Sequence, residues 1–228
     1  MVNNQKISER LGYDFAQPEL LKHALTHSSS VNETHQEYSA NNERLEFLGD
    51  AVLETIISDR LYRLLPAEEE GRLTKMRASI VCEESLAEIG QSLGVGQALI
   101  LGRGEERSGG RSRSSMIADG VEAIIGAVYL DGGFAAAQKI VLRLFDFTIG
   151  QAVAGKLHAD YKTALQERMQ SLGDISIQYR LDRQEGPDHD RRFYISVLIN
   201  DEVLGSGSGR SKKEAEQNAA KAAMKDMR

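Results

Sequence analysis

The sequence predicts an all-α domain followed by a small α+β domain whose elements follow the order α-β-β-β-α. Residues 43–65 and 116–130 repeat apolar side chains with the period of an α-helix. Residues 191–199 instead alternate apolar and polar side chains, as a strand does. Residues 150–160, GQAVAGKLHAD, carry two glycines and neither period. We therefore predict a helical domain over 1–150, a linker over 151–159 and an α+β domain over 160–228.

The composition favours a folded, cytoplasmic protein. Hydrophobic residues make up 41% of the 228 residues, which is enough for packed cores. Cys82 is the single cysteine, so no disulfide can form within the chain. The start, MVNNQKISERLGYDF, lacks the apolar segment of a signal peptide. No run approaches the roughly 18 apolar residues of a membrane span, so we expect a cytoplasmic location and no membrane partner.

The net charge of −6 is concentrated in the predicted first domain. Residues 160–228 hold 12 basic and 12 acidic residues, which leaves 16 of the chain's 28 basic and 22 of its 34 acidic residues for the remainder. A neutral domain binds nucleic acid only through local clusters of basic side chains. The acidic excess of the first domain would be partly cancelled by bound metal.

The first acidic pattern lies in ERLEFLGDAVL at 43–53. At about 100° per residue, its carboxylates form one stripe of a helix that is apolar on its other sides. The stripe consists of Glu43, Glu46, Asp50 and Glu54. Arg44 is the only basic residue between 43 and 59, and buried carboxylates need a compensating cation. A bound metal ion is one interpretation, and a surface helix with a solvated acidic face is the other.

A second acidic pair occurs in MIADGVEAIIGAVYLD at 116–131. Asp119 and Glu122 lie three residues apart, hence on one helix face, and apolar residues surround them. Carboxylates converging from two helices would suit a hard divalent cation, and Mg²⁺ prefers such oxygen ligands. Zinc is less suitable, because its usual Cys and His ligand sets are missing.

These acidic segments resemble the bacterial ribonuclease III family. The resemblance is carried by NERLEFLGDAVL at 42–53, EEEGRLTKMRA at 68–78, ADGVEAIIGAVYLDGG at 118–133 and the opening LGYDFAQPELLKHALTHSS at 11–29. The C-terminal part resembles that family's double-stranded-RNA-binding domain. The resemblance covers nearly the whole chain in the family's order, and ERLEFLGD is a highly specific motif.

The resemblance implies a homodimeric, Mg²⁺-dependent endoribonuclease that cleaves double-stranded RNA, with Mn²⁺ as a possible substitute metal. Products would carry 5′-phosphate and 3′-hydroxyl ends with short 3′ overhangs. The role would be to process ribosomal RNA precursors and other structured transcripts, including messenger RNA. Asp50 and Glu122 would be catalytic, with Glu43 and Glu70 in supporting roles. The implied metal ligands are Glu46, Asp50, Asp119 and Glu122. No small-molecule substrate is implied.

Further helices are expected before and after the acidic ones. They span 5–37 as two helices, 67–94 and 134–150. Pro18 marks the start of the second helix, Pro66 ends the helix over 43–65, and Gly132-Gly133 ends the helix over 116–130. His23 and His27 have the spacing of a metal pair, but we favour a structural role because no third ligand is near. GRGEERSGGRSRSS at 102–115 predicts a loop, either a solvated connection or a phosphate-contacting arm.

The second domain begins with an amphipathic helix over 161–172. Strands are expected over 175–183, 191–199 and 203–209, with a turn at Asn200-Asp201. Ser211-Lys212-Lys213-Glu214 forms a capping box that opens a final helix.

Three features of this domain suit duplex RNA. Lys212 and Lys213 oppose the helix dipole at the first turn, which is favourable only if phosphates dock there; a plain solvated helix start is the alternative. His189, in PDHD at 187–190, matches by resemblance a second groove contact. A polar face suited to the 2′-hydroxyls of the shallow minor groove consists of Thr163, Gln166, Glu167 and Gln170.

Two other functions stay open at this point. The chain could bind double-stranded RNA without cleaving it, although acids at all the matching positions argue against this. It could also be a metal-dependent phosphatase for a small substrate. The second domain argues against this, because it is suited to the groove of duplex RNA and offers no small pocket. Cleavage of duplex RNA with and without Mg²⁺ distinguishes these functions.

Overall fold

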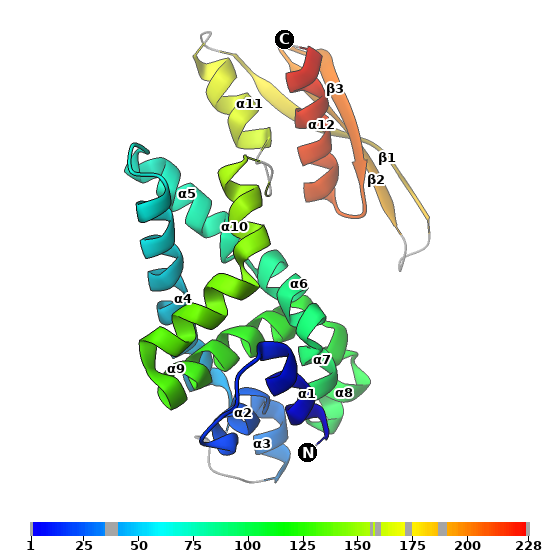
Figure 1. The fold of residues 1–228 in the computed structure, drawn as a ribbon. Coiled ribbons are helices and arrows are strands. Elements are labelled where there is room, and N and C mark those ends of the chain that lie inside the picture. The colour runs from blue at the N-terminus through cyan, green and yellow to red at the C-terminus, as the bar shows by residue number, and fades with distance from the viewer. Residues whose placement is uncertain are drawn as a thin grey trace. The chain divides into compact units, whose positions relative to one another are not determined.

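The structure, a computed structural model, divides into two compact units, residues 1–157 and 158–228 (Figure 1). It describes residues 2–34, 41–155, 157, 161–171, 175–186 and 191–226. The predicted linker over 151–159 begins inside a helix, because α10 runs from Asp146 to Val153.

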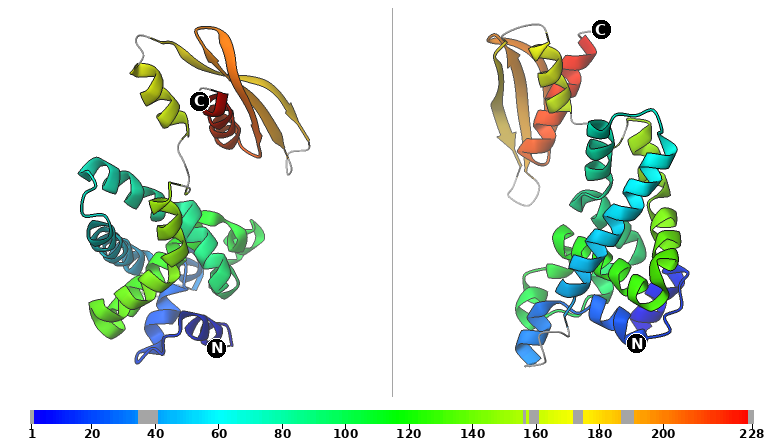
Figure 2. Two further views of the ribbon diagram at one scale, coloured as in Figure 1. Left: turned by 45° about the horizontal axis from the view of Figure 1, so that its top comes forward. Right: turned by 90° about the vertical axis from the view of Figure 1, so that its left-hand side faces the viewer.

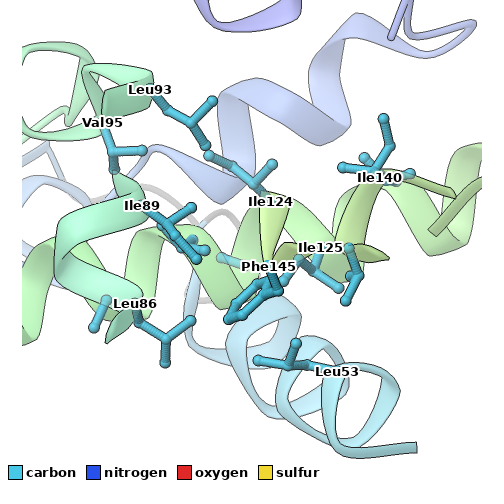
Figure 3. Close-up of a cluster of buried hydrophobic side chains, with 14 of the residues drawn as sticks. Leu53, Leu86, Ile89, Leu93, Val95, Ile124, Ile125, Ile140 and Phe145 are labelled. Atoms are coloured by element: carbon cyan, nitrogen blue, oxygen red, sulfur yellow. The ribbon is translucent and has the colours of Figure 1, made fainter. Parts of the chain in front are cut away.

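The first unit is helical, as predicted. Its helices are α1 (Val2–Leu11), α2 (Pro18–Ala24), α3 (Ser28–Thr34), α4 (Glu43–Leu64), α5 (Glu70–Ile80), α6 (Glu83–Leu93), α7 (Val95–Ala98), α8 (Arg103–Arg107), α9 (Ser114–Leu144) and α10. The apolar faces of α4, α6 and α9 meet around Phe145, which is fully buried among Leu53, Leu86, Ile124 and Ile125 (Figure 3). This core fixes the directions of the two acidic helices.

Several element boundaries differ from the predictions. The described part of residues 5–37 contains parts of three helices instead of two. Thr26, which lies between α2 and α3, forms a β-bridge with the distant Ile100 at the point where the helical path is interrupted. The stretch 67–94 is broken at Val81 and Cys82. The loop predicted over 102–115 contains α8 and a 3₁₀ turn, Gly110–Ser112. Helix boundaries are the features that periodicity specifies least well.

Helix α9 also corrects the expectation about apolar length. By length and composition Ser114–Leu144 is apolar enough to cross a membrane, but half of its most apolar window is buried inside the unit. Its backbone is not one continuous helix, since Gly133 has φ 77° and turns the chain. The helix predicted over 116–130 and the one predicted from 134 therefore adjoin at this turn. Burial against α4 is typical of a core helix of a compact domain.

Asp131 ties the far end of this acidic helix segment to the amino-terminal residues. Its Oδ2 accepts hydrogen bonds from the Tyr13 hydroxyl at 2.8 Å and from the Ala16 N–H at 2.9 Å, and its Oδ1 accepts from the Gln17 N–H at 2.8 Å. The bonded residues are more than 110 positions apart in sequence. The carboxylate also lies at the start of α2, where a negative charge is favourable.

The second unit has the predicted α-β-β-β-α order. Its elements are α11 (Tyr161–Gln170), β1 (Ile177–Glu185), β2 (Arg192–Ile199), β3 (Glu202–Gly209) and α12 (Lys212–Asp226). The strands form one antiparallel sheet in the order β1-β2-β3, and both helices cover the same face of it (Figure 2). Asn200 and Asp201 have φ 49° and 68° and make the predicted turn.

Helix α12 lies directly on β3. A Cβ at Gly205 would lie 2.5 Å from the Ala223 nitrogen, and one at Gly207 would lie 2.2 Å from the Ala219 nitrogen. Two residues of a strand and four residues of a helix advance the chain by similar distances, about 6.6 Å and 6 Å. Alternate glycines of β3 therefore match every fourth residue of α12 along an apolar seam.

Candidate functional site

Three carboxylates from two helices meet in the first unit. Glu46 of α4 and Asp119 and Glu122 of α9 each offer an oxygen atom, and these oxygens all lie within 4.8 Å of one another. All three side chains are half-buried. Within the described ranges no ion pair includes any of them. Among the described residues, the cluster therefore gathers carboxylates that no ion pair neutralises.

Two glycines permit this convergence. A Cβ at Gly49 would lie 1.8 Å from the Glu122 carbonyl oxygen, and one at Gly126 would lie 2.3 Å from the Leu45 carbonyl oxygen. The backbones of α4 and α9 thus touch where they cross. Gly49 lies between Glu46 and Asp50, and Gly126 lies one helical turn after Glu122. The closest approach of the helices is therefore next to the acidic residues.

The cluster carries strongly perturbed acids. Burial, then the charges of Asp50, Glu46 and Asp119, raises the pKa of Glu122 to about 8. Burial also raises the pKa of Glu46, with further contributions from Asp119, Glu43 and Asp50. The metal-free cluster therefore holds a proton at neutral pH. A divalent cation would replace that proton, and the all-oxygen donor set fits Mg²⁺ or Mn²⁺.

The other predicted acidic residues lie at different distances from this cluster. Asp50 and Glu43 are close enough to raise the pKa of cluster members, although neither belongs to the group of three. Glu54, the last residue of the predicted acidic stripe, also raises the pKa of Glu122. Glu70 accepts a hydrogen bond from the Thr74 hydroxyl at 2.8 Å. The described contacts of Glu70 do not include the cluster.

Asp119 has two neighbours that were not predicted as site residues. Burial raises its pKa, His27 lowers it and Glu83 raises it. Helix α6 begins at Glu83 and packs on α9, a contact without a signal in the sequence. His27 had a signal, its four-residue spacing from His23, for which we favoured a structural role, and the group of three acids includes neither histidine.

Two of the four arginines of residues 102–115 have structural partners. Arg111 donates to the carbonyl oxygens of Leu99 at 2.6 Å and Gly96 at 3.1 Å, and pairs with Glu106 at 2.7 Å. Arg113 pairs with Glu105 at 3.2 Å. Arg111 thus caps the carboxyl end of α7, where a cation is favourable. A phosphate-contacting role for Arg111 would require these bonds to break.

The predicted RNA-binding residues lie mainly on exposed surface of the second unit. Gln166, Glu167 and Gln170 are exposed on α11 and Thr163 is half-buried, while Leu165 and Met169 face the core. Lys212 and Lys213 are exposed in the first turn of α12. His189 lies outside the described residues.

The predicted capping box is present with one change. The Ser211 hydroxyl accepts from the Glu214 N–H at 3.1 Å, as a capping box requires. The Glu214 carboxylate accepts from the Arg210 N–H at 2.7 Å, one residue earlier than predicted. Both bonds hold the amino end of α12, and hence the two lysines, in place.

Comparison with known proteins matches both units. The model of the Ribonuclease-III-like family matches residues 17–146. Ribonuclease 3 of Desulforamulus reducens is 50% identical over 97% of this chain and 90% of its own length. Ribonuclease 3 of Borreliella burgdorferi is 46% identical over 97% and 90%.

The chain belongs to the ribonuclease III family. The solved nuclease domain of ribonuclease III from Campylobacter jejuni is 42% identical, with a TM-score of 0.59 over 65% of this chain and 97% of that domain. The double-stranded RNA binding motif matches residues 161–227. This ribonuclease III chain is therefore an endoribonuclease with a helical nuclease domain and a double-stranded-RNA-binding domain.

Proposed function

We propose that this ribonuclease III cleaves double-stranded RNA with Mg²⁺ at the acidic cluster, leaving 5′-phosphate and 3′-hydroxyl ends with short 3′ overhangs. The observation that carries the proposal is the approach of Glu46, Asp119 and Glu122 within 4.8 Å. The raised pKa of Glu122 supports it, because perturbed acids in a compact cluster are typical of functional sites. A purely structural role would not require acids to be brought together against their mutual repulsion.

Each acidic residue has a proposed role. Glu46, Asp50, Asp119 and Glu122 would hold the metal, and Asp50 and Glu122 would be the catalytic pair. Bound Mg²⁺ would orient and acidify water and polarise the phosphodiester. The Glu122 carboxylate must be ionised to serve as a ligand, so a proton leaves it before or during metal binding. Glu43 and Glu70 would support the site from its margin.

The experiment uses long duplex RNA incubated with the full chain, with Mg²⁺, with Mn²⁺ and with EDTA. We expect short duplex products only with metal, with 5′-phosphates detected by end labelling after phosphatase treatment. Cleavage that persists in EDTA would reject the metal-dependent reaction. Binding without cleavage in Mg²⁺ would favour an inactive RNA binder, and hydrolysis of small phosphate esters instead of RNA would favour a phosphatase.

The double-stranded-RNA-binding domain would supply most of the affinity for the duplex. Lys212 and Lys213 would contact phosphates, and the polar face of α11 would contact 2′-hydroxyls in the minor groove. His189 would make the second groove contact, a role that follows from the resemblance alone. A duplex of DNA should therefore compete poorly with duplex RNA in a binding assay.

We also propose that the chain acts as a homodimer in the cytoplasm, on ribosomal RNA precursors and other structured transcripts, including messenger RNA. Support comes from Phe47, a residue that is 80% exposed next to the acidic stripe of α4. The nuclease domain from Campylobacter jejuni has a region involved in dimer formation. Light scattering at micromolar concentration should give twice the mass of one chain, and Phe47→Ala should lower that mass. A monomeric wild-type protein would reject the dimer.

A further inference from the structure

Two side-chain contacts join α11 to α12, the helices that carry most of the proposed RNA contacts. The helices lie side by side on one face of the sheet (Figure 2). Lys162, the second residue of α11, donates its backbone N–H to Gln217 Oε1 at 3.2 Å, and its Nζ pairs with Glu216 Oε2 at 2.6 Å. The bonded residues are 55 and 54 positions apart in sequence. Residues distant in the chain therefore attach the start of α11 to α12.

The backbone contact satisfies a group that the helix itself cannot satisfy. The first N–H groups of an α-helix have no acceptor within that helix. The N–H of Lys162 belongs to this first turn, and the Gln217 side chain supplies its acceptor. The amino end of α11 is thereby held at one position along α12.

The Lys162 ammonium is held from a second side as well. Its Nζ lies 4.6 Å from the centroid of the Tyr179 ring of β1, which packs against the core beneath the helices. The side chains of Lys162 and Glu216 are 35% and 26% exposed, and such a partly exposed ion pair adds little to stability. An ammonium held by a carboxylate and a ring has little freedom to move, so the main effect of these contacts is on geometry.

These contacts lie between the two sets of proposed RNA contacts. Gln166, on the polar face of α11, comes one helical turn after Lys162. Lys213, in the first turn of α12, comes one helical turn before Gln217. A change in the contacts between the helices would therefore change the distance between the polar face of α11 and the first turn of α12.

We propose that Lys162, Glu216 and Gln217 are positioning residues that set this distance and thereby the preference for duplex RNA over duplex DNA. This inference rests on the proposed function, in which both surfaces contact the duplex. Duplex RNA is recognised by its A-form shape, through 2′-hydroxyls in the minor groove and phosphates of the adjoining major groove. Two surfaces at a fixed distance can meet both groups on an A-form helix, whereas B-form DNA has other groove dimensions and no 2′-hydroxyls.

Three variants of the full chain test the proposal, in EDTA so that the duplex stays intact. Gln217→Ala removes the acceptor for α11. Glu216→Ala and Lys162→Met each break the ion pair, and they change the net charge in opposite directions. Fluorescence titration gives the dissociation constants for an RNA duplex and for a DNA duplex of the same sequence at one salt concentration. The ratio of these two constants is the preference for RNA.

We expect each variant to lower the preference for RNA about 5-fold, the size of effect that the loss of one hydrogen bond produces. Glu216→Ala should strengthen binding to DNA and Lys162→Met should weaken it, because attraction to phosphates depends on charge. A residue that acts only through its charge would change both dissociation constants in parallel and leave the ratio unchanged. An unchanged ratio in any of the three variants would overturn the proposal.

Three control variants make the same chemical changes elsewhere in the domain. Gln178→Ala, Glu202→Ala and Lys225→Met alter exposed residues on β1, at the start of β3 and near the carboxyl end of α12. Their ratios should equal that of the wild-type protein, and an equal loss of preference in the controls would also overturn the proposal. Circular dichroism checks the fold of each variant. If one of the three test variants fails to fold, the other two decide.

The wild-type protein separates this inference from the function on which it rests. A wild-type chain that binds RNA and DNA duplexes equally well would reject the proposed RNA-binding surface and this inference with it. A wild-type preference for RNA that all three test variants retain would reject only the positioning role.

Discussion

The crossing of α4 with α9 and the contact of β3 with α12 are both built on glycines, but they bring different groups together. In the nuclease domain, Gly49 and Gly126 let two backbones touch beside Glu46 and Glu122. In the RNA-binding domain, the glycines of β3 face alanines of α12 that are fully buried. One close approach gathers like charges, and the other forms an apolar seam.

This difference separates packing for function from packing for stability. Where Gly205 and Gly207 of β3 meet Ala223 and Ala219 of α12, the contact is between apolar groups and backbone, so it adds dispersion and apolar burial. The crossing of α4 and α9 forces an acid with a pKa of about 8 into a half-buried position. This arrangement lowers the free energy of unfolding of the metal-free domain, and binding of a cation offsets that loss.

The largest expected effect comes from Gly49→Ala. Its Cβ would meet the Glu122 carbonyl at 1.8 Å, so α4 and α9 must move apart and the cluster must open. We expect about 3 kcal/mol lower stability of the nuclease domain and a loss of cleavage by roughly 10³-fold or more. Urea denaturation and single-turnover cleavage measure the two effects.

Gly71→Ala is the matched control, because a Cβ at Gly71 would meet nothing within 4 Å. Near the start of α5 this change should leave cleavage unchanged and slightly increase stability. If both alanine variants behaved alike, the crossing would not be what assembles the site.

Glu122→Gln replaces the carboxyl group with an amide of nearly the same shape, so the packing should be kept. The amide is a poorer ligand for a hard cation, so single-turnover cleavage should fall by roughly 10³-fold, equivalent to about 4 kcal/mol. Duplex binding should persist, because the second domain is untouched. Near wild-type cleavage would exclude Glu122 from the mechanism, and a parallel loss of binding would place its effect in the fold.

Gly207→Ala is the corresponding change in the apolar seam. Its Cβ would lie 2.2 Å from the Ala219 nitrogen, and α12 must shift on the sheet. We expect the RNA-binding domain to lose about 1–3 kcal/mol of stability and the affinity for duplex RNA to fall, as measured by a gel-shift titration. Val203→Ala, at an exposed position of the same strand, should leave binding intact. Equal binding by both variants would argue against the seam as a support for the RNA surface.

Replacing Lys212 and Lys213 together by Ala tests the surface that the seam supports. Each phosphate contact contributes about one unit to the slope of log affinity against log salt. The slope should therefore decrease in magnitude by about two, equally on all duplex sequences. Lys225→Ala, near the other end of α12, should leave the slope unchanged. A loss confined to particular sequences would contradict a phosphate role.

The smallest expected effect is a pH dependence of stability without metal. The pKa of Glu122 is about 8 in the folded domain and near 4.5 ordinarily. Between these values the unfolded chain releases the proton and the folded domain retains it, so the free energy of unfolding should fall as pH rises from about 4.5 to about 8. With screening by solvent, we expect a loss of about 1 kcal/mol relative to Glu122→Gln. Urea denaturation in EDTA at pH 5.5 and pH 8 measures it, and parallel pH profiles would contradict it.

The helical class of the first domain and the order of elements in the second could be predicted because each depends on local periodicity. Glu46, Asp119 and Glu122 could be named because acids embedded in apolar helices are anomalous and because their motifs resemble a family. The geometry that brings them within 4.8 Å depends on Gly49 and Gly126. Neither glycine differs in local pattern from any other helical glycine.

The partners of Asp119 and Arg111 could not be predicted for a related reason. Glu83 reaches Asp119 only because α6 packs on α9, and Arg111 caps α7 across a chain separation of 12 residues from Leu99. In the sequence, Arg111 is one of four similar arginines in a Gly- and Ser-rich stretch. Tertiary packing selects Arg111 as the one that caps α7.

The hydrogen bonds of Asp131 set an order of events during protein synthesis. The Ala16 and Gln17 N–H groups find their acceptor 115 and 114 residues later in the chain. At about 5–20 residues per second, a ribosome needs roughly 6–23 s to add that length. Throughout this interval the amino-terminal helices lack the side chain that anchors them, and the apolar faces that will cover α9 stay available to chaperones. The nuclease domain therefore completes its fold late, once the second acidic helix has been made.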